Sequence, residues 1–282
     1  MKSVKSKILL GMVATIVIGM LVVGLTSIFL SLTSSKEMLQ TSMQGTAEIA
    51  AARVEFELRA YTETASMAGQ NALLSDETAT VAEKEEYVNR MATEFGMTRG
   101  NLLDLNGDSL FDGNNYADRE YFQRAKEGES FVSTPTLSKV TGELSILVAA
   151  PVYEGGNSAN EIVGVVYFVP EETFLNDIMM SVNVSENSEA FMLDKTGTTI
   201  ADIKLETIST QNIEEEAKSD ASLEQLAVYA ADMRAGNTGV GEYTMSGSTK
   251  LLAYAPINNT DGWSLGVATP LSDLMGSVYT SA

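Results

Sequence analysis

The feature that most constrains this chain is an uncharged apolar run near its N-terminus, residues 8–33, ILLGMVATIVIGMLVVGLTSIFLSLT. About 20 apolar residues, rising about 1.5 Å each, cross a bilayer core, so this run can span a membrane with some tilt. A signal peptide has a shorter apolar core, about 7–15 residues, followed by a small-residue cleavage site. The run therefore predicts an uncleaved transmembrane helix.

Charges next to this run predict its orientation. Lys2, Lys5 and Lys7 are the only charged residues before residue 36. Positive flanking residues favour the cytoplasm, so we expect residues 1–7 inside the cell and everything after residue 34 outside the plasma membrane.

Composition narrows the class of function. The 282 residues include no cysteine and no histidine, which removes disulfides, thiol nucleophiles, Cys/His zinc sites and the commonest general base. The net charge is −20, so we expect no nucleic-acid partner. No Gly-x-Ser-x-Gly elbow or phosphate-binding loop is present. The composition favours a protein that is not an enzyme and needs no cofactor or metal.

Two helical segments are predicted after the membrane. Apolar residues recur every three or four positions within residues 34–75, which indicates a long amphipathic stalk helix. A second helix is expected across VAEKEEYVNRMATEF, residues 81–95. The apolar stripe of the stalk would permit a homodimer.

A repeated motif then appears. LLDLNGDSLFDG, residues 102–113, resembles a calcium loop, but the EF-hand positions for glycine and glutamate hold Ser109 and Asn115. Its echo FMLDKTGTTIAD, residues 191–202, carries Lys195 and Thr196 where calcium ligands would stand. Both stretches are better explained as a strand, a tight turn at Gly107 or Gly197, and a second strand.

A second echo indicates that a whole module is repeated. SILVAAPVY and IVGVVYFVP, ending near Pro151 and Pro170, reappear as KLLAYAPIN and WSLGVATP with Pro256 and Pro270. ETFLNDIMMSV and SLEQLAVYAADMRAG are expected to be helices. The predicted fold class is α+β, with two tandem PAS-like antiparallel-sheet modules. Both modules follow the transmembrane helix. We expect the membrane-distal module in residues 76–180, the membrane-proximal module in residues 181–272, and a C-terminal helix in residues 273–282.

Several stretches together resemble the double Cache (dCache_1) sensor domain of bacterial transmembrane receptors. They are DREYFQRAKEGESFVSTPTLSKVTGELSILVAAPVY, GVVYFVPEETF and DGWSLGVATPLSDLM, and the similarity covers about residues 36–276. With its anchor and stalk, the chain looks most like a methyl-accepting chemotaxis protein. Histidine kinases and diguanylate cyclases carry the same outer domain and stay open alternatives.

The resemblance implies a ligand pocket in the membrane-distal module. Family members that bind amino acids hold the carboxylate with an arginine followed by two aromatic residues, which corresponds to Arg119, Tyr121 and Phe122. A guanidinium is a planar two-pronged donor for a carboxylate. The alternative is that Arg119 pairs on the surface with Asp118 or Glu120.

Other positions depart from the amino-acid binders. Thr136 and Ser138 stand where those proteins have a tyrosine and an aspartate, and Val169 stands where an aspartate would hold the ammonium. Strand alternation places Tyr167 on the same face as Val169. A small carboxylate or a flat nucleobase-like ring therefore fits these positions better than a standard amino acid. The amino acid stays open as a third ligand class.

Further expectations concern single residues and rival functions. Trp263 is expected in the core. Lys139, at a hairpin tip, is expected in solvent, although it could reach a ligand anion. An extracellular enzyme using Glu171 and Glu172 is a weak rival, because adjacent strand residues point apart. A scaffold is another rival, and a second span after residue 282 would favour the sensor.

Overall fold

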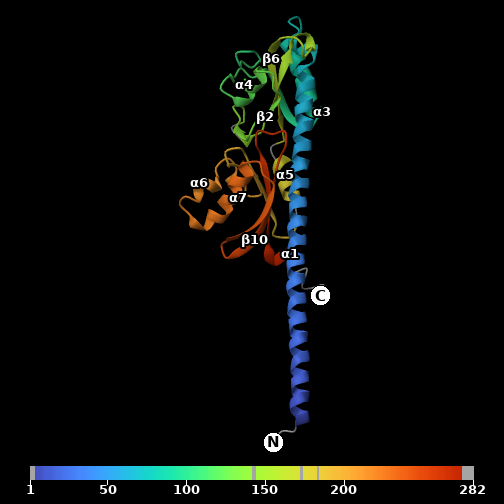
Figure 1. The fold of residues 1–282 in the computed structure, drawn as a ribbon. Helices are drawn as coiled ribbons and strands as arrows, with labels where there is room; N and C mark the ends of the chain where they lie inside the picture. Colours follow the sequence, from blue (N-terminus) through green and yellow to red (C-terminus); the bar gives the residue numbers. More distant parts are fainter. Residues whose placement is uncertain (1–3, 142–143, 172–173, 183, 275–282) are drawn as a thin grey trace.

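A single long helix runs along both modules of the molecule. The computed structural model describes residues 4–141, 144–171, 174–182 and 184–274. Helix α1, Val4–Gly69, has 66 residues and is therefore about 100 Å long. Figure 1 shows two modules lying one beyond the other along the same side of α1, away from its N-terminal end. The predicted apolar run and the stalk are one continuous helix.

Small residues allow α1 to lie close against both sheets. Its packed face carries the buried residues Met43, Ala47, Ala50, Ala51, Val54, Leu58, Ala65 and Ala68. The helix ends at Gly69, where a Cβ would lie 2.0 Å from the carbonyl oxygen of Pro151, so only glycine permits this approach. The predicted stalk extended to residue 75, but Asn71 instead caps a separate short helix by accepting a bond from the amide of Leu73.

The membrane-distal module contains an antiparallel sheet in the order β1-β6-β5-β2. Helix α3 covers one face together with α1, and its N-terminus is closed by a capping box between Thr80 and Glu83. The other face carries α4 and a small β3–β4 hairpin. The elements are α2 Ala72–Ser75, α3 Val81–Glu94, β1 Met97–Leu103, α4 Glu120–Lys126, β2 Phe131–Val132, β3 Thr136–Leu137, β4 Leu144–Ser145, β5 Val148–Tyr153, the 3-10 turn Glu154–Gly156 and β6 Ile162–Pro170.

The membrane-proximal module contains an antiparallel sheet in the order β8-β7-β11-β10-β9. Figure 1 shows α6 and α7 on the side of this sheet that faces away from α1. The elements are α5 Phe174–Ser181, β7 Glu189–Leu193, β8 Thr199–Asp202, α6 Ile213–Glu216, α7 Glu224–Arg234, β9 Gly239–Met245, β10 Ser248–Pro256 and β11 Ser264–Pro270, with 3-10 turns at Leu205–Thr207 and Ala221–Leu223.

The two sheets share one central arrangement, because the order β1-β6-β5 recurs as β7-β11-β10. The fold class is therefore α+β with two PAS-like antiparallel sheets, which confirms the prediction. The two segment pairs of the β echo form the antiparallel strand pairs β5–β6 and β10–β11.

The repeated turn has the same geometry in both copies. The Asp104 carboxylate accepts bonds from the amides of Asn106 and Asp108 at 2.8 and 2.9 Å, and the Asp194 carboxylate accepts equivalent bonds at 2.8 and 3.0 Å. Gly107 and Gly197 have φ of 84° and 83°, a region that suits glycine. After the first turn, however, the predicted second strand is reduced to isolated bridges such as Leu103↔Ser109, whereas β8 follows the second.

Each sheet is buried on both faces. Phe168 belongs to the core that joins both modules to α1, while Tyr167 and Val169 face α4 in a separate distal core. Strand alternation predicted this shared face correctly. Trp263 is 1% exposed within the joining core, as expected.

Some predicted elements fall partly outside the described residues. These are residues 1–3 of the N-terminal segment, Glu172 of the suggested acid pair, and residues 275–282 of the C-terminal helix.

Candidate functional site in the membrane-distal module

The start of α4 places the predicted arginine at the edge of the distal core. Arg119 is the N-cap residue of α4, and its side chain is 21% exposed. Tyr121 and Phe122 follow in the first turn and are both buried. The guanidinium Nη1 of Arg119 donates to the hydroxyl of Thr136 on β3 at 3.0 Å. The chain thus folds so that α4 and the β3–β4 hairpin meet at Arg119.

A small cavity lies at this meeting point. Its volume is about 10 Å³, room for about one water molecule. Its lining combines aromatic and cationic side chains: Arg99, Tyr116, Arg119, Tyr121, Thr136, Ser138, Lys139, Leu147 and Tyr167. Three cations and no carboxylate line it among the described residues, in a chain of net charge −20.

Arg99, on β1, is the least satisfied of the three cations. Its Nη2 donates to the hydroxyl of Ser138 at 2.8 Å, and its buried Nε has no hydrogen-bond partner. Arg99 forms no ion pair within the part of the chain that the structure describes. A partly buried guanidinium with only a neutral partner favours an incoming anion.

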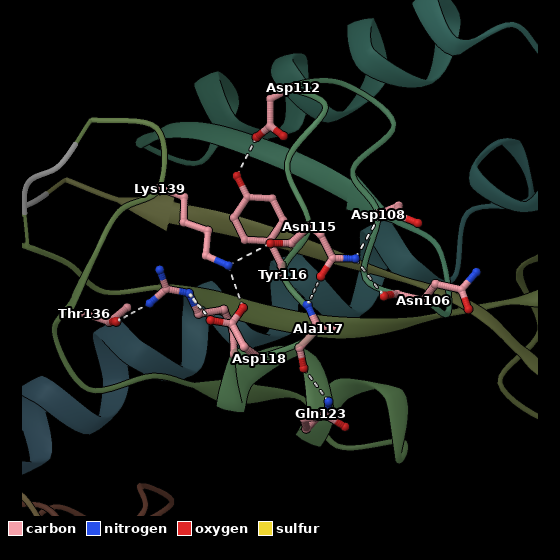
Figure 2. Close-up of polar contacts among 11 residues, drawn as sticks. Asn106, Asp108, Asp112, Asn115, Tyr116, Ala117, Asp118, Gln123, Thr136 and Lys139 are labelled. Atoms are coloured by element: carbon pink, nitrogen blue, oxygen red, sulfur yellow. Dashed lines mark hydrogen bonds and ion pairs between the residues drawn. The ribbon is translucent and has the colours of Figure 1, made fainter.

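The other two cations, Arg119 and Lys139, lie near the carboxylate of Asp118, which does not line the cavity. Lys139 donates to the Asp118 carboxylate at 2.6 Å and to the carbonyl of Asn115 at 2.8 Å, as Figure 2 shows. The bond from Lys139 holds the pKa of Asp118 below its usual value. Lys139 is exposed, as predicted, but its ammonium is also held by these two acceptors. Arg119 Nε lies 3.9 Å from Asp118, a long contact with a mostly exposed carboxylate.

Three tyrosine rings form the apolar wall. Tyr167 packs edge-on against Tyr116 and Tyr121, with ring centroids 5.6 and 5.3 Å apart. Burial first, and then the bond to Asp112, raises the pKa of the Tyr116 hydroxyl, so it stays protonated as a donor. Burial also raises the pKa of Tyr121. The wall is neutral and aromatic, which suits the apolar part of a small ligand.

A hydrogen-bond network fixes this wall from behind. Tyr116 donates to Asp112 at 2.6 Å, as Figure 2 shows, and Asn101 donates to the same carboxylate at 2.8 Å. Asn101 also donates to the Tyr167 hydroxyl at 3.1 Å. Burial alone would raise the pKa of Asp112, but the bonds from Tyr116, Ser109 and Asn114 bring it below its usual value. Asp112 is thus ionised, and the bonds that it accepts from Tyr116 and Asn101 hold the wall in place.

Five of the seven predicted site residues line the cavity: Arg119, Tyr121, Thr136, Ser138 and Tyr167. Phe122 and Val169 do not line it, because both pack in the distal core behind the wall. Sequence reasoning missed Arg99, Tyr116 and Asn101. Arg99 and Asn101 share one face of β1 by simple alternation, and a cation within a strand of an acidic chain was the available signal.

The comparisons with known proteins agree with this architecture. The sequence matches the Cache domain family (dCache_1) over residues 31–278. The chain belongs to the Cache domain family. No curated protein matches it. The match covers both modules and all of α1 beyond the apolar run, so the resemblance is confirmed.

Solved receptor domains show the same fold at low sequence identity. The ligand-binding domain of the Pseudomonas fluorescens chemoreceptor CtaA, in complex with L-isoleucine, is 16% identical with a TM-score of 0.68, over 87% of this chain and 98% of that one. The Campylobacter jejuni chemoreceptor Tlp3, in complex with 4-methylisoleucine, is 13% identical with a TM-score of 0.65, over 86% and 94%. The extracellular domain of the putative histidine kinase mmHK1S-Z2 is 15% identical with a TM-score of 0.63, over 86% and 99%.

Proposed function

We propose that this Cache protein is the extracytoplasmic sensor region of a transmembrane receptor and that its distal module binds a small carboxylate. The observation that carries the proposal is Arg99, whose guanidinium lines the cavity without a counter-ion among the described residues. Arg119 and Lys139 add positive charge to the same wall. A flat neutral heterocycle would leave Arg99 without an anionic partner, so the carboxylate is favoured over the ring.

The ligand would replace bonds that the protein now makes internally. Arg99 and Arg119 donate to the hydroxyls of Ser138 and Thr136. A carboxylate offers two charged oxygens to such donors, and charge-assisted bonds are about twice as strong as neutral ones. Because the cavity has only about 10 Å³, binding must separate α4 from the residues of β3 as the ligand enters.

An α-amino acid is a poorer fit than a simple carboxylate. The neighbouring Cache structures hold isoleucine or its relatives. Here an ammonium would need an acceptor, but Asp112 already accepts bonds from Tyr116 and Asn101, and Asp118 is held by Lys139. Val169 is buried behind the wall and supplies no acceptor.

Membrane anchoring and signalling complete the proposed role. Within the described residues, one helix is long and apolar enough to cross a membrane, and it is the N-terminal part of α1. Ligand would favour one of two arrangements of the distal module and pass that preference to α1, which touches both sheets. A chemoreceptor is the favoured output, and a histidine kinase or diguanylate cyclase is the alternative. The solved structures with this fold include domains of a chemoreceptor and of a histidine kinase.

A homodimer through α1 is part of the proposal. Met38, Ile49, Phe56 and Met67 are each more than half exposed. Their spacings of 11, 7 and 11 residues correspond to whole helical turns, so they form one stripe turned away from the sheets. A second copy of α1 would cover this stripe. Changing Ile49 and Phe56 together to glutamate should convert the detergent-purified dimer into monomers, as measured by light scattering.

The carboxylate proposal is tested by ligand-dependent thermal unfolding of the full chain in detergent. The panel contains small mono- and dicarboxylates, their neutral amides, α-amino acids and nucleobases. A specific carboxylate at about 100 times its Kd should stabilise the fold by about 2.7 kcal/mol. Arg99→Gln and Arg119→Ala should each weaken this response by about tenfold or more.

The matched control is Arg59→Ala, which removes the same charge from an exposed pair with Glu63 on α1. It should leave the response unchanged. A carboxylate response that survives in Arg99→Gln and Arg119→Ala would refute the assigned site. A response to amino acids alone would refute the proposed ligand class, and an absence of any response would refute direct binding.

A further inference from the structure

A groove of about 460 Å³ lies where α1 and the two modules meet. Its lining comes from α1, from the segment between α4 and β2 of the distal module, and from the loop between β10 and β11 of the proximal module. Figure 1 shows this loop reaching the distal module beside β2. The groove is larger than the distal cavity and than a cavity of about 130 Å³ within the proximal module. Sites for small molecules have about 300–1,000 Å³ and occur preferentially at domain interfaces, so this groove suits one.

The charges of the groove are already balanced by the protein. Each of the three carboxylates that line it forms an ion pair, and these pairs are Glu63 with Arg59, Glu129 with Arg124, and Asp261 with Lys195. Arg124, the cation of the lining, gives both of its printed bonds to Glu129, at 2.7 and 2.8 Å. An ionic ligand would therefore find no unpaired charge among the described lining residues, and it would lose its own hydration on entry. The groove thus favours a neutral ligand over an ion.

Several polar atoms of the lining nevertheless keep bonding capacity. Glu63 accepts its ion-pair bond at Oε1 and Asp261 at Oδ2, so Oε2 of Glu63 and Oδ1 of Asp261 accept no bond from the described residues. Asn259 donates through its amide nitrogen, and its side-chain oxygen accepts no bond within the described chain. Nη1 of Arg124 donates to no group in the same part of the chain. The lining therefore offers three acceptors and one donor, contributed by α1 and both modules.

Apolar side chains complete the lining. Phe131 and Val132 belong to it and are 5% and 8% exposed. The guanidinium of Arg124 lies over the Phe131 ring, with its Cζ 4.8 Å from the ring centroid. The ligand that matches this lining is neutral, has an apolar face, and carries several groups that both donate and accept hydrogen bonds. A sugar ring combines these properties, because its C–H groups form apolar faces and its hydroxyls donate and accept.

We propose that this groove binds a free neutral mono- or disaccharide, whose hydroxyls donate to Glu63, Asp261 and Asn259 and accept from Arg124. Bonds from a hydroxyl to a carboxylate are charge-assisted, and are therefore stronger than bonds between neutral groups. The proposal does not depend on the carboxylate site, because the groove and the distal cavity share no lining residue. A sugar bound to α1 and to both modules would favour one arrangement of these three parts, and would thus act as a second input to the receptor.

The test is titration calorimetry of the full chain in detergent with glucose, galactose, maltose and sucrose at millimolar concentrations. Sugars also stabilise proteins by exclusion from their surface, and calorimetry at these concentrations reports saturable binding instead. At least one neutral sugar should bind, and its amino-sugar and uronic-acid counterparts should bind more weakly. Glu63→Gln and Asp261→Asn should each weaken binding by about tenfold or more, because a charge-assisted bond is lost.

The matched control is Glu48→Gln, which neutralises an exposed carboxylate of α1 that does not line the groove. It should bind the sugar like the wild type. Glu63 is also exposed, so Glu63→Gln should unfold at the same temperature as the control, and its loss of binding then reports the site. The proposal is overturned if no neutral sugar binds, if a charged counterpart binds as tightly as the neutral sugar, or if Glu63→Gln and Asp261→Asn bind like Glu48→Gln.

Discussion

Equivalent strands of the distal and proximal modules carry cavity-lining residues of opposite charge. Arg99 on β1 precedes the turn residue Asp104 by the same interval, 99 to 104, by which Glu189 on β7 precedes Asp194, 189 to 194. Both residues line the cavity of their module. Arg99 has no ion-pair partner in the described chain, while Glu189 has two lysines.

This difference separates the requirements of the fold from those of the site. The repeated turn and the repeated sheet order are kept in both modules, because they depend on backbone geometry and apolar packing. The residues that face the cavities are not fixed by these requirements, and they differ. One Cache architecture therefore places residues of opposite charge at equivalent positions of its two modules.

The largest expected effect concerns the repeated turn. Gly107→Ala and Gly197→Ala both place a side chain at φ above 80°, which costs about 1–2 kcal/mol. At Gly107 the new Cβ would also lie 2.5 Å from the backbone nitrogen of Ala117, whereas at Gly197 it meets only the end of the Glu214 side chain at 2.9 Å. Overpacking against backbone adds about 1–3 kcal/mol. Denaturant unfolding should show Gly107→Ala to be the more destabilised variant.

Equal losses in the two variants would contradict this comparison and show that the turn geometry alone sets the cost. A matched control is Gly113→Ala, where φ is 73° but no atom lies within 4 Å of the new Cβ. Its loss should resemble that of Gly197→Ala.

The turns and the sheet repeat could be predicted from sequence because their signals are local. Asp104 and Gly107 lie within one turn, and prolines recur in the paired strands at similar intervals. The distal site could be predicted only in part. Arg119 and its neighbours formed a recognisable motif, but Arg99 joins them through the pairing of β1 with β6, and no local pattern reports that pairing. The ion pair of Lys139 was not predicted, because its partner Asp118 lies on another segment.

The cavity of about 130 Å³ in the proximal module could be predicted only in part. The hairpin echo contains Phe191, Thr199 and Asp202 of its lining, but Tyr243 and Met245 come from β9, which no repeat includes.

The next effect tests the charge reversal. Arg99→Gln should weaken carboxylate binding by about tenfold or more while changing stability little, because it removes a cation without an ion pair. Glu189→Gln should leave carboxylate binding unchanged but lower the free energy of unfolding by about 1–3 kcal/mol, because it leaves Lys250, whose side chain is 13% exposed, without its carboxylate. Titration calorimetry and denaturant unfolding on both variants measure the two effects. If Glu189→Gln weakened carboxylate binding as much as Arg99→Gln, the modules would not be chemically independent.

The smallest effect compares two buried tyrosines. Tyr116→Phe removes a bond of 2.6 Å to Asp112 and should cost about 1 kcal/mol near neutral pH, while Tyr243→Phe removes no protein hydrogen bond and should cost close to nothing. The pKa of Asp112 is lowered in the folded protein, so its contribution is complete above the unfolded pKa, about 4, and is lost as the pH falls through the folded value. Tyr116→Phe should therefore make the stability of the protein less dependent on pH below about 4, and Tyr243→Phe should follow the wild-type curve. Denaturant unfolding at several pH values between neutral and acid measures this, and identical curves for all three proteins would show that the Tyr116–Asp112 bond does not stabilise the distal wall.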